Sequence, residues 1–159
     1  MAASSVAERH LDELIEIMRE AASAYIGGNI RRYFELMQHA DDFTSMSPLG
    51  GDASRDSGRS EESIEELERY FQGGEASLEV IETYSSGDLA VLVVVERQHG
   101  KVSSLPPQDW SLRVTLVFRR EGSTWRLVHR HADALVRPVS FELVAALARG
   151  EADSPSSAD

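Results

Sequence analysis

The sequence has no cysteine among its 159 residues, and basic residues are few relative to acidic ones. The missing cysteines exclude disulfide bonds, thiolate metal ligands and a cysteine nucleophile, and they are compatible with a reducing compartment. Sixteen Lys and Arg against 27 Asp and Glu give a net charge of −11. Because such a field repels phosphate backbones and anionic lipids, we expect neither a nucleic-acid nor a membrane partner.

Long apolar runs are also missing. The longest uninterrupted one, residues 89–95, is too short to span a bilayer. Near the N-terminus, Glu8 and Arg9 stand where a signal peptide would carry its apolar stretch. We therefore expect a cytoplasmic protein. The hydrophobic fraction of 42% and the charged fraction of 27% are typical of a globular chain, and the length fits one domain.

Three helices are predicted in the first half of the chain. Apolar residues recur at three- and four-residue steps over residues 6–26, which indicates an amphipathic helix. Asn29 is the expected N-cap of a second, shorter helix that forms a hairpin with the first, and Ser60 is the expected N-cap of a third. A short strand around Phe43 is predicted between the second and the third helix.

The second half of the chain has the pattern of a β-sheet. Residues 77–84 and 89–99 form one predicted hairpin, and residues 110–120 and 124–134 form a second one. Short turn sequences with glycine separate the strands within each hairpin. The pattern therefore predicts a four-stranded antiparallel meander.

A last helix, residues 140–149, is predicted after Pro138, with Ser140 as its N-cap. Residues 151–159 are acidic, rich in serine and without a bulky apolar group, so we expect them to be disordered. We expect a single domain over residues 1–150, with its core in residues 6–136.

The order helix, helix, short strand, helix and long meander ends in the segment Trp125-Arg126-Leu127-Val128-His129-Arg130-His131-Ala132-Asp133. Together with the strand at residues 112–120, this segment resembles the closing hairpin of the SnoaL-like branch of the nuclear transport factor 2-like superfamily. It is also similar to the end of the calcium/calmodulin-dependent kinase II association domain. The resemblance implies an α+β fold in which a cone-shaped, curved antiparallel sheet wraps around the N-terminal helices, as in the cystatin-like roll.

The resemblance implies a pocket for a small molecule, but it leaves the activity open because the superfamily holds both enzymes and assembly domains. One hypothesis is a cofactor-independent isomerase, cyclase or hydratase acting on a small apolar substrate. The alternative is a non-catalytic dimerisation or ligand-sensing module. Two features depart from the family pattern: Asp133 stands where many relatives have Ser, and a helix follows Pro138 where shorter relatives end.

Polar residues on several predicted strands provide the candidate site. Alternate side chains of a strand share a face, so polar residues two positions apart point the same way. Which face of the sheet lies inward cannot be read from this alternation. The candidates are Glu96, Arg113, Thr115, His129, His131 and Asp133, with Tyr25 of the first helix above them.

The catalytic hypothesis assigns Asp133, His131 and Glu96 as catalytic residues, with a carboxylate as general base. Tyr25 or Tyr70 then donates to a developing oxyanion. Arg113, Thr115 and His129 are expected to contact the ligand as well. The competing interpretation is structural, because Glu96 and Arg113 on neighbouring strands are expected to form a cross-strand ion pair.

We expect no metal and no organic cofactor. His129, His131 and Asp133 form a two-histidine, one-carboxylate set by residue type, but three residues in line on one strand rarely converge on one ion. The other histidines, His10, His39 and His99, stand in no site pattern.

A homodimer formed through the outer face of the sheet is expected, since one helical layer covers only one face of the sheet. The apolar residues Phe141, Val144 and Leu147 of the last helix also need a partner. Because an isolated helix of about ten residues is marginal in water, we expect this helix to dock on the sheet, on the cavity mouth or on the partner subunit.

Overall fold

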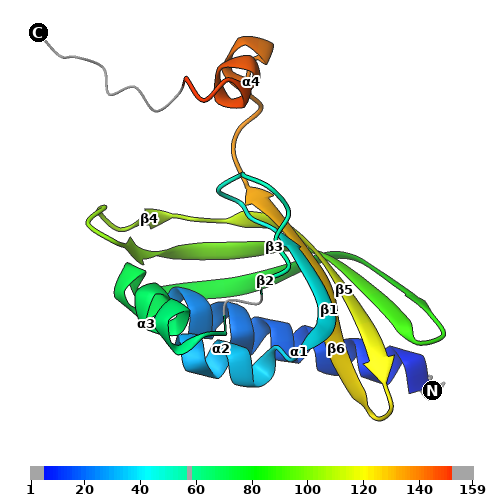
Figure 1. Ribbon diagram of the computed structural model, residues 1–159. Helices are drawn as coiled ribbons and strands as arrows, with labels where there is room; N and C mark the ends of the chain where they lie inside the picture. Colours follow the sequence, from blue (N-terminus) through cyan, green and yellow to red (C-terminus); the bar gives the residue numbers. More distant parts are fainter. Residues whose placement is uncertain (1–5, 57–58, 152–159) are drawn as a thin grey trace, which may run out of the picture.

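The computed structural model describes residues 6–56 and 59–151 and contains four helices and six strands in that part of the chain (Figure 1). In chain order they are α1 (Val6–Ile26), α2 (Ile30–Leu36), β1 (His39–Met46), α3 (Glu61–Tyr70), β2 (Phe71–Ser86), β3 (Leu89–Val102), β4 (Gln108–Asp109), β5 (Leu112–Glu121), β6 (Thr124–Ala134) and α4 (Phe141–Ala148). None of these helices is long and apolar enough to cross a membrane.

The predicted helix N-caps are confirmed. The side chain of Asn29 accepts a hydrogen bond from the backbone N–H of Arg32, at the start of α2. Ser60 and Ser140 cap α3 and α4 in the same way. Each bond satisfies a backbone donor that the first helical turn leaves without a partner.

The sheet contains the predicted meander, in the order β2, β3, β5 and β6, and all of these pairs are antiparallel. Two features were not predicted. Strand β1 pairs in parallel with β6, so the sheet is mixed rather than purely antiparallel, and the short strand β4 pairs with β3. Strand β2 begins at Phe71, six residues before the predicted start, because α3 ends directly at Tyr70.

Helices α1 and α2 cover one face of the sheet, which we call the inner face (Figure 1). The core lies between them, where apolar side chains of α1 meet inward-facing residues of every long strand. Fully or almost fully buried members include Met18, Leu92, Leu116 and Leu127. The opposite, outer face is not covered by any of these helices, and partly exposed valines such as Val93 and Val95 lie on it.

A β-bulge interrupts β6. Val117 pairs with His129 whereas the next residue, Phe118, pairs with Leu127, so Val128 is an extra residue without a partner in β5. A bulge of this kind changes the alternation of side chains along a strand. As a result Leu127 and Arg130, three residues apart, both point to the inner face.

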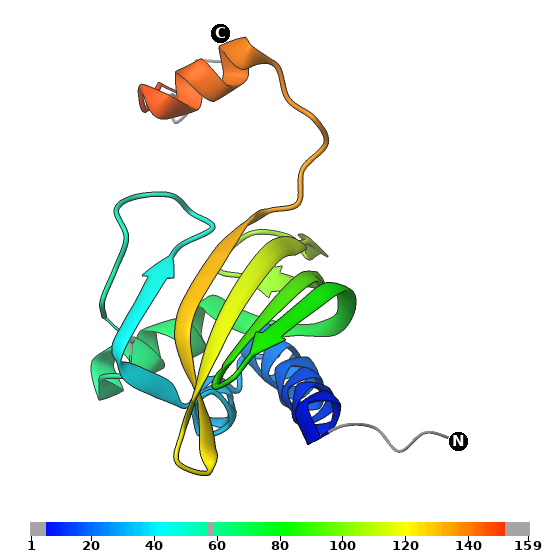
Figure 2. The same cartoon turned by 90° about the vertical axis from the view of Figure 1, so that its right-hand side faces the viewer.

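Helix α4 forms at the predicted place but does not pack on the other described elements of the chain. Figures 1 and 2 show it standing apart from the sheet, at the end of an extended segment that follows β6. None of its residues is buried, and Phe141 is 91% exposed. The expectation that this helix docks on the sheet or a cavity mouth of its own chain is therefore wrong. Docking on a partner subunit stays a prediction. Of the expected disordered tail, residues 152–159 lie outside the described residues.

Gly28 lies in a tight connection between α1 and α2, and its replacement provides a test of that connection. Its φ of +83° is a conformation that L residues rarely adopt, and an added Cβ would collide with the backbone oxygen of Phe71. Gly50 has a similar φ of +85° but open space around it, so it is the matched control. We expect Gly50→Ala to cost about 1 to 2 kcal/mol and Gly28→Ala at least ~2 kcal/mol more, measured by urea denaturation. Equal losses would contradict the close approach of Phe71.

Candidate functional site

Among the described residues, the most deeply buried charged group of the inner face is the carboxylate of Glu96. Strand β3 places Glu96 among buried valines and leucines, and the side chain of Glu96 is only 4% exposed. Arg130 of β6 donates to both carboxylate oxygens, at 3.3 and 3.1 Å, and Gln98 donates to Oε2 at 2.8 Å. The carboxylate is thus held by two donors, one of them a counter-charge, as a buried charge requires.

Two tyrosines lie close to this pair. Tyr25 at the end of α1 and Tyr33 of α2 make an edge-to-face contact, with ring centroids 4.9 Å apart. Burial, together with the neighbouring Tyr33, raises the pKa of Tyr25 to about 12. Burial likewise raises the pKa of Tyr33. Both phenols therefore stay protonated at neutral pH and can act as hydrogen-bond donors.

The group formed by Tyr25, Tyr33, Glu96, Gln98 and Arg130 is called the inner polar cluster below. Burial by itself would lower the pKa of Arg130, but the attraction of Glu96 and the tyrosines outweighs it and the pKa lies above its usual value. The Arg130 side chain keeps 20% of its surface accessible. Within the described residues, neither tyrosine hydroxyl has a hydrogen-bond partner. The cluster therefore offers two neutral donors and a cation beside an accessible surface.

His39 is a half-buried neighbour of the cluster. Its ring stacks on Phe43 with centroids 3.9 Å apart, and neither of its buried ring nitrogens has a hydrogen-bond partner in the described part of the chain. Burial, helped by the positive charges of Arg59 and Arg130, lowers the pKa of His39 from 6.5 to about 4. No pattern in the sequence indicated this environment. We assign His39 a role in the core and not in binding a ligand.

The other sequence-predicted residues lie on the outer face. Arg113 donates to Asp133 at 2.6 Å, and both side chains are exposed, by 63% and 46%. With His131 and Thr115 they border a shallow hollow of about 320 Å³. The remaining lining is apolar: Ile81, Val93, Val94, Val95 and Val114. We call this feature the outer hollow.

The predicted ion pair between Glu96 and Arg113 is wrong. In the register of β3 and β5, Arg113 pairs with Val95 and Glu96 with Leu112, so the two charged side chains point to opposite faces. Each finds its partner on β6, where Glu96 meets Arg130 and Arg113 meets Asp133. The candidate residues are thus divided between two faces of the sheet. Tyr25 and Glu96 lie on the inner face, whereas Arg113, Thr115, His131 and Asp133 lie on the outer one.

His129 does not belong to either group. Its Nδ1 is 2.8 Å from the hydroxyl oxygen of Thr44 on β1, which ties the parallel strand to β6. Its ring and that of His131 are 6.5 Å apart. Among residues 6–56 and 59–151, no group of three or more histidine or acidic side chains is arranged to hold a metal ion.

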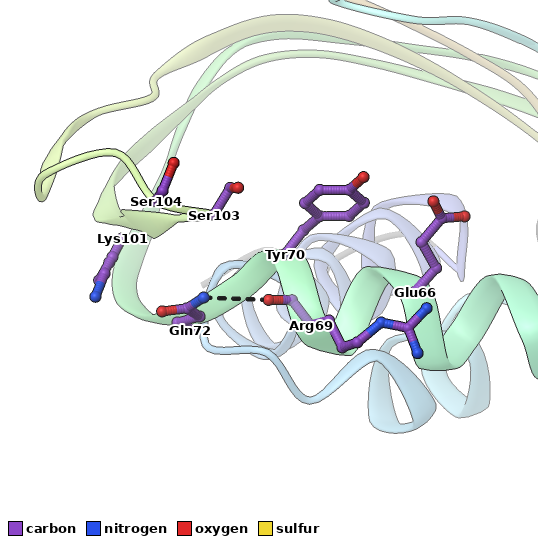
Figure 3. A pocket seen from close by; sticks show the side chains of 7 residues that line it. All are labelled: Glu66, Arg69, Tyr70, Gln72, Lys101, Ser103 and Ser104. Carbon is purple, nitrogen blue, oxygen red and sulfur yellow. Dashed lines mark hydrogen bonds between the residues drawn. The ribbon is translucent and has the colours of Figure 1, made fainter.

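A second, more open recess of about 450 Å³ lies where α3 ends (Figure 3). Arg69 and Tyr70 border it on one side and Lys101 and Ser103 on the other. Figure 3 shows the Arg69 and Lys101 side chains leaving the recess in different directions. Its polar groups therefore do not converge on one point, and we do not treat it as the candidate site.

The comparisons with known proteins agree with this architecture. The family described as SnoaL-like domain matches residues 14–136, which is most of the chain, and the protein therefore belongs to this family. A comparison with curated proteins finds no match.

Similar solved structures are NTF2-like proteins and kinase association domains. One is a nuclear transport factor 2-like superfamily protein from Salmonella enterica, with a TM-score of 0.65, 14% identity and coverage of 88% of this chain and 99% of that one. Another is the S. rosetta CaMKII hub, with a TM-score of 0.62, 17% identity and coverage of 84% and 99%. A third is a protein with a cystatin-like fold from Caulobacter vibrioides, with a TM-score of 0.58, 19% identity and coverage of 87% and 95%. These similarities confirm the predicted α+β fold.

Sequence reasoning missed Arg130 and Tyr33. One face of β5 is apolar, with Leu112, Leu116 and Phe118. An arginine that faces inward beside these residues needs a buried partner, and Arg130 is such an arginine because Leu116 pairs with it. The sequence alone does not give this register of β5 on β6. That register includes the bulge at Val128, which simple alternation along β6 does not anticipate.

The buried and exposed ion pairs provide a direct comparison. Arg130→Met removes the cation but keeps most of the volume, so it leaves Glu96 buried without a counter-charge. We expect it to lower the free energy of unfolding by about 3 to 5 kcal/mol, whereas Arg113→Met on the outer face should cost less than about 1 kcal/mol. Urea denaturation measures both. Adding Glu96→Leu to Arg130→Met should recover most of the loss, and a double variant as unstable as Arg130→Met would contradict the assignment.

The stacked His39 predicts a specific dependence of stability on pH. Its pKa is about 4 in the folded chain and 6.5, the ordinary value for histidine, in the unfolded chain, so only the unfolded chain takes up a proton between these values. Stability from this residue is complete above pH 6.5 and decreases as the pH falls toward 4. We expect His39→Phe to flatten the decrease in melting temperature over this interval. His99→Gln, on an exposed side chain, is the control, and equal slopes for all three proteins would exclude this role of His39.

Proposed function

We propose that the protein binds a small, largely apolar molecule that carries an oxygen acceptor, at the inner polar cluster. The observation that carries the proposal is the pair of protonated, unpartnered phenols of Tyr25 and Tyr33 beside the accessible part of Arg130. These groups are hydrogen-bond donors that suit an oxygen atom of a ligand, and apolar side chains of the core lie around them.

The energetic cost of the cluster supports a role beyond folding. An ion pair inside an apolar layer gives little net stability, because the loss of hydration offsets the attraction between the charges. Leucine and methionine at positions 96 and 130 would serve the core at least as well. A buried ion pair whose neighbours have shifted pKa values is therefore a candidate binding site.

Binding is better supported than base catalysis by Glu96. Both of its carboxylate oxygens accept from Arg130, and Gln98 donates to one of them as well. A general base must be free to accept a proton in the protonation state that the reaction needs. The expected role of Asp133 as a base also loses support, because its carboxylate is exposed and paired with Arg113. His131 lies on the same outer face, and its expected catalytic role loses support with it.

The similar structures support a pocket or assembly role without selecting an activity. They include proteins named only by fold and others named as kinase hubs, at identities that show the fold alone. The choice of ligand class rests on the donors of the inner polar cluster and not on these names.

A thermal-shift titration with naphthol, indanone, cyclohexenone and benzoate tests the proposal. Each compound joins an apolar ring to an oxygen acceptor, and a compound that binds only the folded chain raises its melting temperature by mass action. We expect at least one of them to produce a concentration-dependent rise. Tyr25→Phe removes one hydroxyl but keeps the ring, and it should weaken the response roughly tenfold in apparent affinity.

Tyr84→Phe is the matched control, because Tyr84 is an exposed tyrosine near the tip of the hairpin between β2 and β3. It should respond to the compounds as the unsubstituted chain does. A response that survives both Tyr25→Phe and Tyr33→Phe would place binding elsewhere, and no response to any of the compounds would count against this ligand class.

A further inference from the structure

We propose that helix α4 of one chain packs into the outer hollow of a second copy, so that two chains exchange their C-terminal helices. Two unpartnered apolar surfaces of the same chain, one a helix and the other a hollow, carry this inference. It does not depend on the ligand proposed for the inner polar cluster.

The helix is apolar around most of its circumference. Its sequence, Phe-Glu-Leu-Val-Ala-Ala-Leu-Ala, has one charged residue, Glu142. The large apolar side chains are exposed by 44% to 91%, with Phe141 the most exposed of them. A helix of eight residues is too short to be stable alone in water, and one that is apolar all round is normally buried. It therefore needs a partner that covers more than one of its sides.

The outer hollow offers a complementary surface. Its floor is made by valines of β3 and by Ile81 of β2, which is 55% exposed, and no described helix of the chain covers it. The charges on its rim are balanced locally, since Arg113 pairs with Asp133. Both surfaces are thus nearly neutral, so they can meet although each chain carries a net charge of −11.

The connection between β6 and α4 favours a second copy as the occupant. The N–H of Leu135 donates to the carbonyl oxygen of Ser111 at 2.9 Å, which fixes the start of the connection beside β5. From there residues 136–140 are exposed and lead α4 away from its own sheet (Figures 1 and 2). About six residues span at most roughly 20 Å. The helix can therefore reach only a copy packed directly against this chain, as in a two-fold pair of outer faces.

The size of the contact also requires more than the helices. Stable interfaces bury roughly 1,200 to 2,000 Å² in total, and eight-residue helices supply only part of that. The exposed parts of Val93 and Val95 around the hollow can supply more. Exchange of α4 therefore extends the dimer through the sheet that the sequence predicts, and it explains why an apolar helix persists without a partner on its own chain.

Engineered cysteines test the exchange without interference, because the chain has no cysteine of its own. One protein carries Val144→Cys in α4 and the other carries Ile81→Cys in the outer hollow, and the two are mixed and oxidised. The control mixture combines Val144→Cys with Ser86→Cys, whose cysteine is exposed at the far end of β2. We expect Val144→Cys to form mixed disulfide dimers with Ile81→Cys in at least tenfold higher yield than with Ser86→Cys. A yield equal to that of the control would overturn the proposal.

The doubly substituted chain, with cysteines at positions 81 and 144, distinguishes exchange from folding back. Exchange predicts covalent dimers, whereas docking of α4 on its own hollow predicts a covalently closed monomer. Closed monomers as the main product, together with a low yield of mixed dimers, would also overturn the proposal.

Light scattering at micromolar concentration gives an independent measurement. We expect twice the chain mass of 17.6 kDa for the full chain, and a mass of 17.6 kDa would overturn the proposal.

Val144→Glu should raise the dimer dissociation constant roughly tenfold or more, because it places a charge in the apolar contact. Ser86→Glu adds the same charge outside the contact and should change the constant little. Since α4 packs on none of the other described elements of its chain, these changes should not unfold the domain. Equal constants for the two variants would show that α4 takes no part in the dimer.

Discussion

One extra residue in strand β6 decides how the polar residues of this protein are distributed. Leu127 points into the core, and uninterrupted alternation would have sent His129, His131 and Asp133 inward after it. Because Val128 bulges out of the pairing with β5, Arg130 points inward instead and the histidines do not. The position of Arg130 beside Glu96 and the place of His131 and Asp133 at the rim of the outer hollow follow from this single irregularity.

The ion pair between Glu96 and Arg130 then sets the electrostatics of the interior. A carboxylate that is 4% exposed needs a close partner, and Arg130 provides one across β5, from a strand that does not pair with β3. The positive charge of Arg130 also reaches His39, where it helps to hold the ring neutral. The phenols of Tyr25 and Tyr33 are left as neutral donors beside the pair. The polar chemistry inside the sheet is thus coupled through one guanidinium group.

The two faces of the sheet differ in their side chains because helices cover only one of them. Helices α1 and α2 cover the inner face, so its side chains are mostly apolar and its buried carboxylate is paired. The outer face has no such cover among the described residues and keeps exposed valines next to the Arg113 and Asp133 pair. The NTF2-like protein and the kinase hub share this fold at identities of 14% and 17%, and such similarity shows the fold alone.

Much of the fold was contained in the sequence. The stripe of apolar residues in α1, the caps Asn29, Ser60 and Ser140, and the valine-rich strands are local signals, and they predicted each described helix and the antiparallel meander. The closing hairpin around Trp125 was enough to indicate the family, which the match over residues 14–136 confirms. Local propensity and periodicity suffice for such features, because each depends on residues close together in the chain.

Only the tertiary structure decided which residues meet. The sequence placed Glu96, Arg113, His131 and Asp133 in strands but could not say which face each one occupies, since a shift of one residue reverses every side chain after it. The bulge at Val128, the parallel pairing of β1 with β6 and the partner of Glu96 are all set by contacts between strands distant in sequence. Helix α4 illustrates the same limit. Its formation depends on local sequence and was predicted, whereas the surface on which it packs depends on residues distant in sequence, which no local pattern encodes.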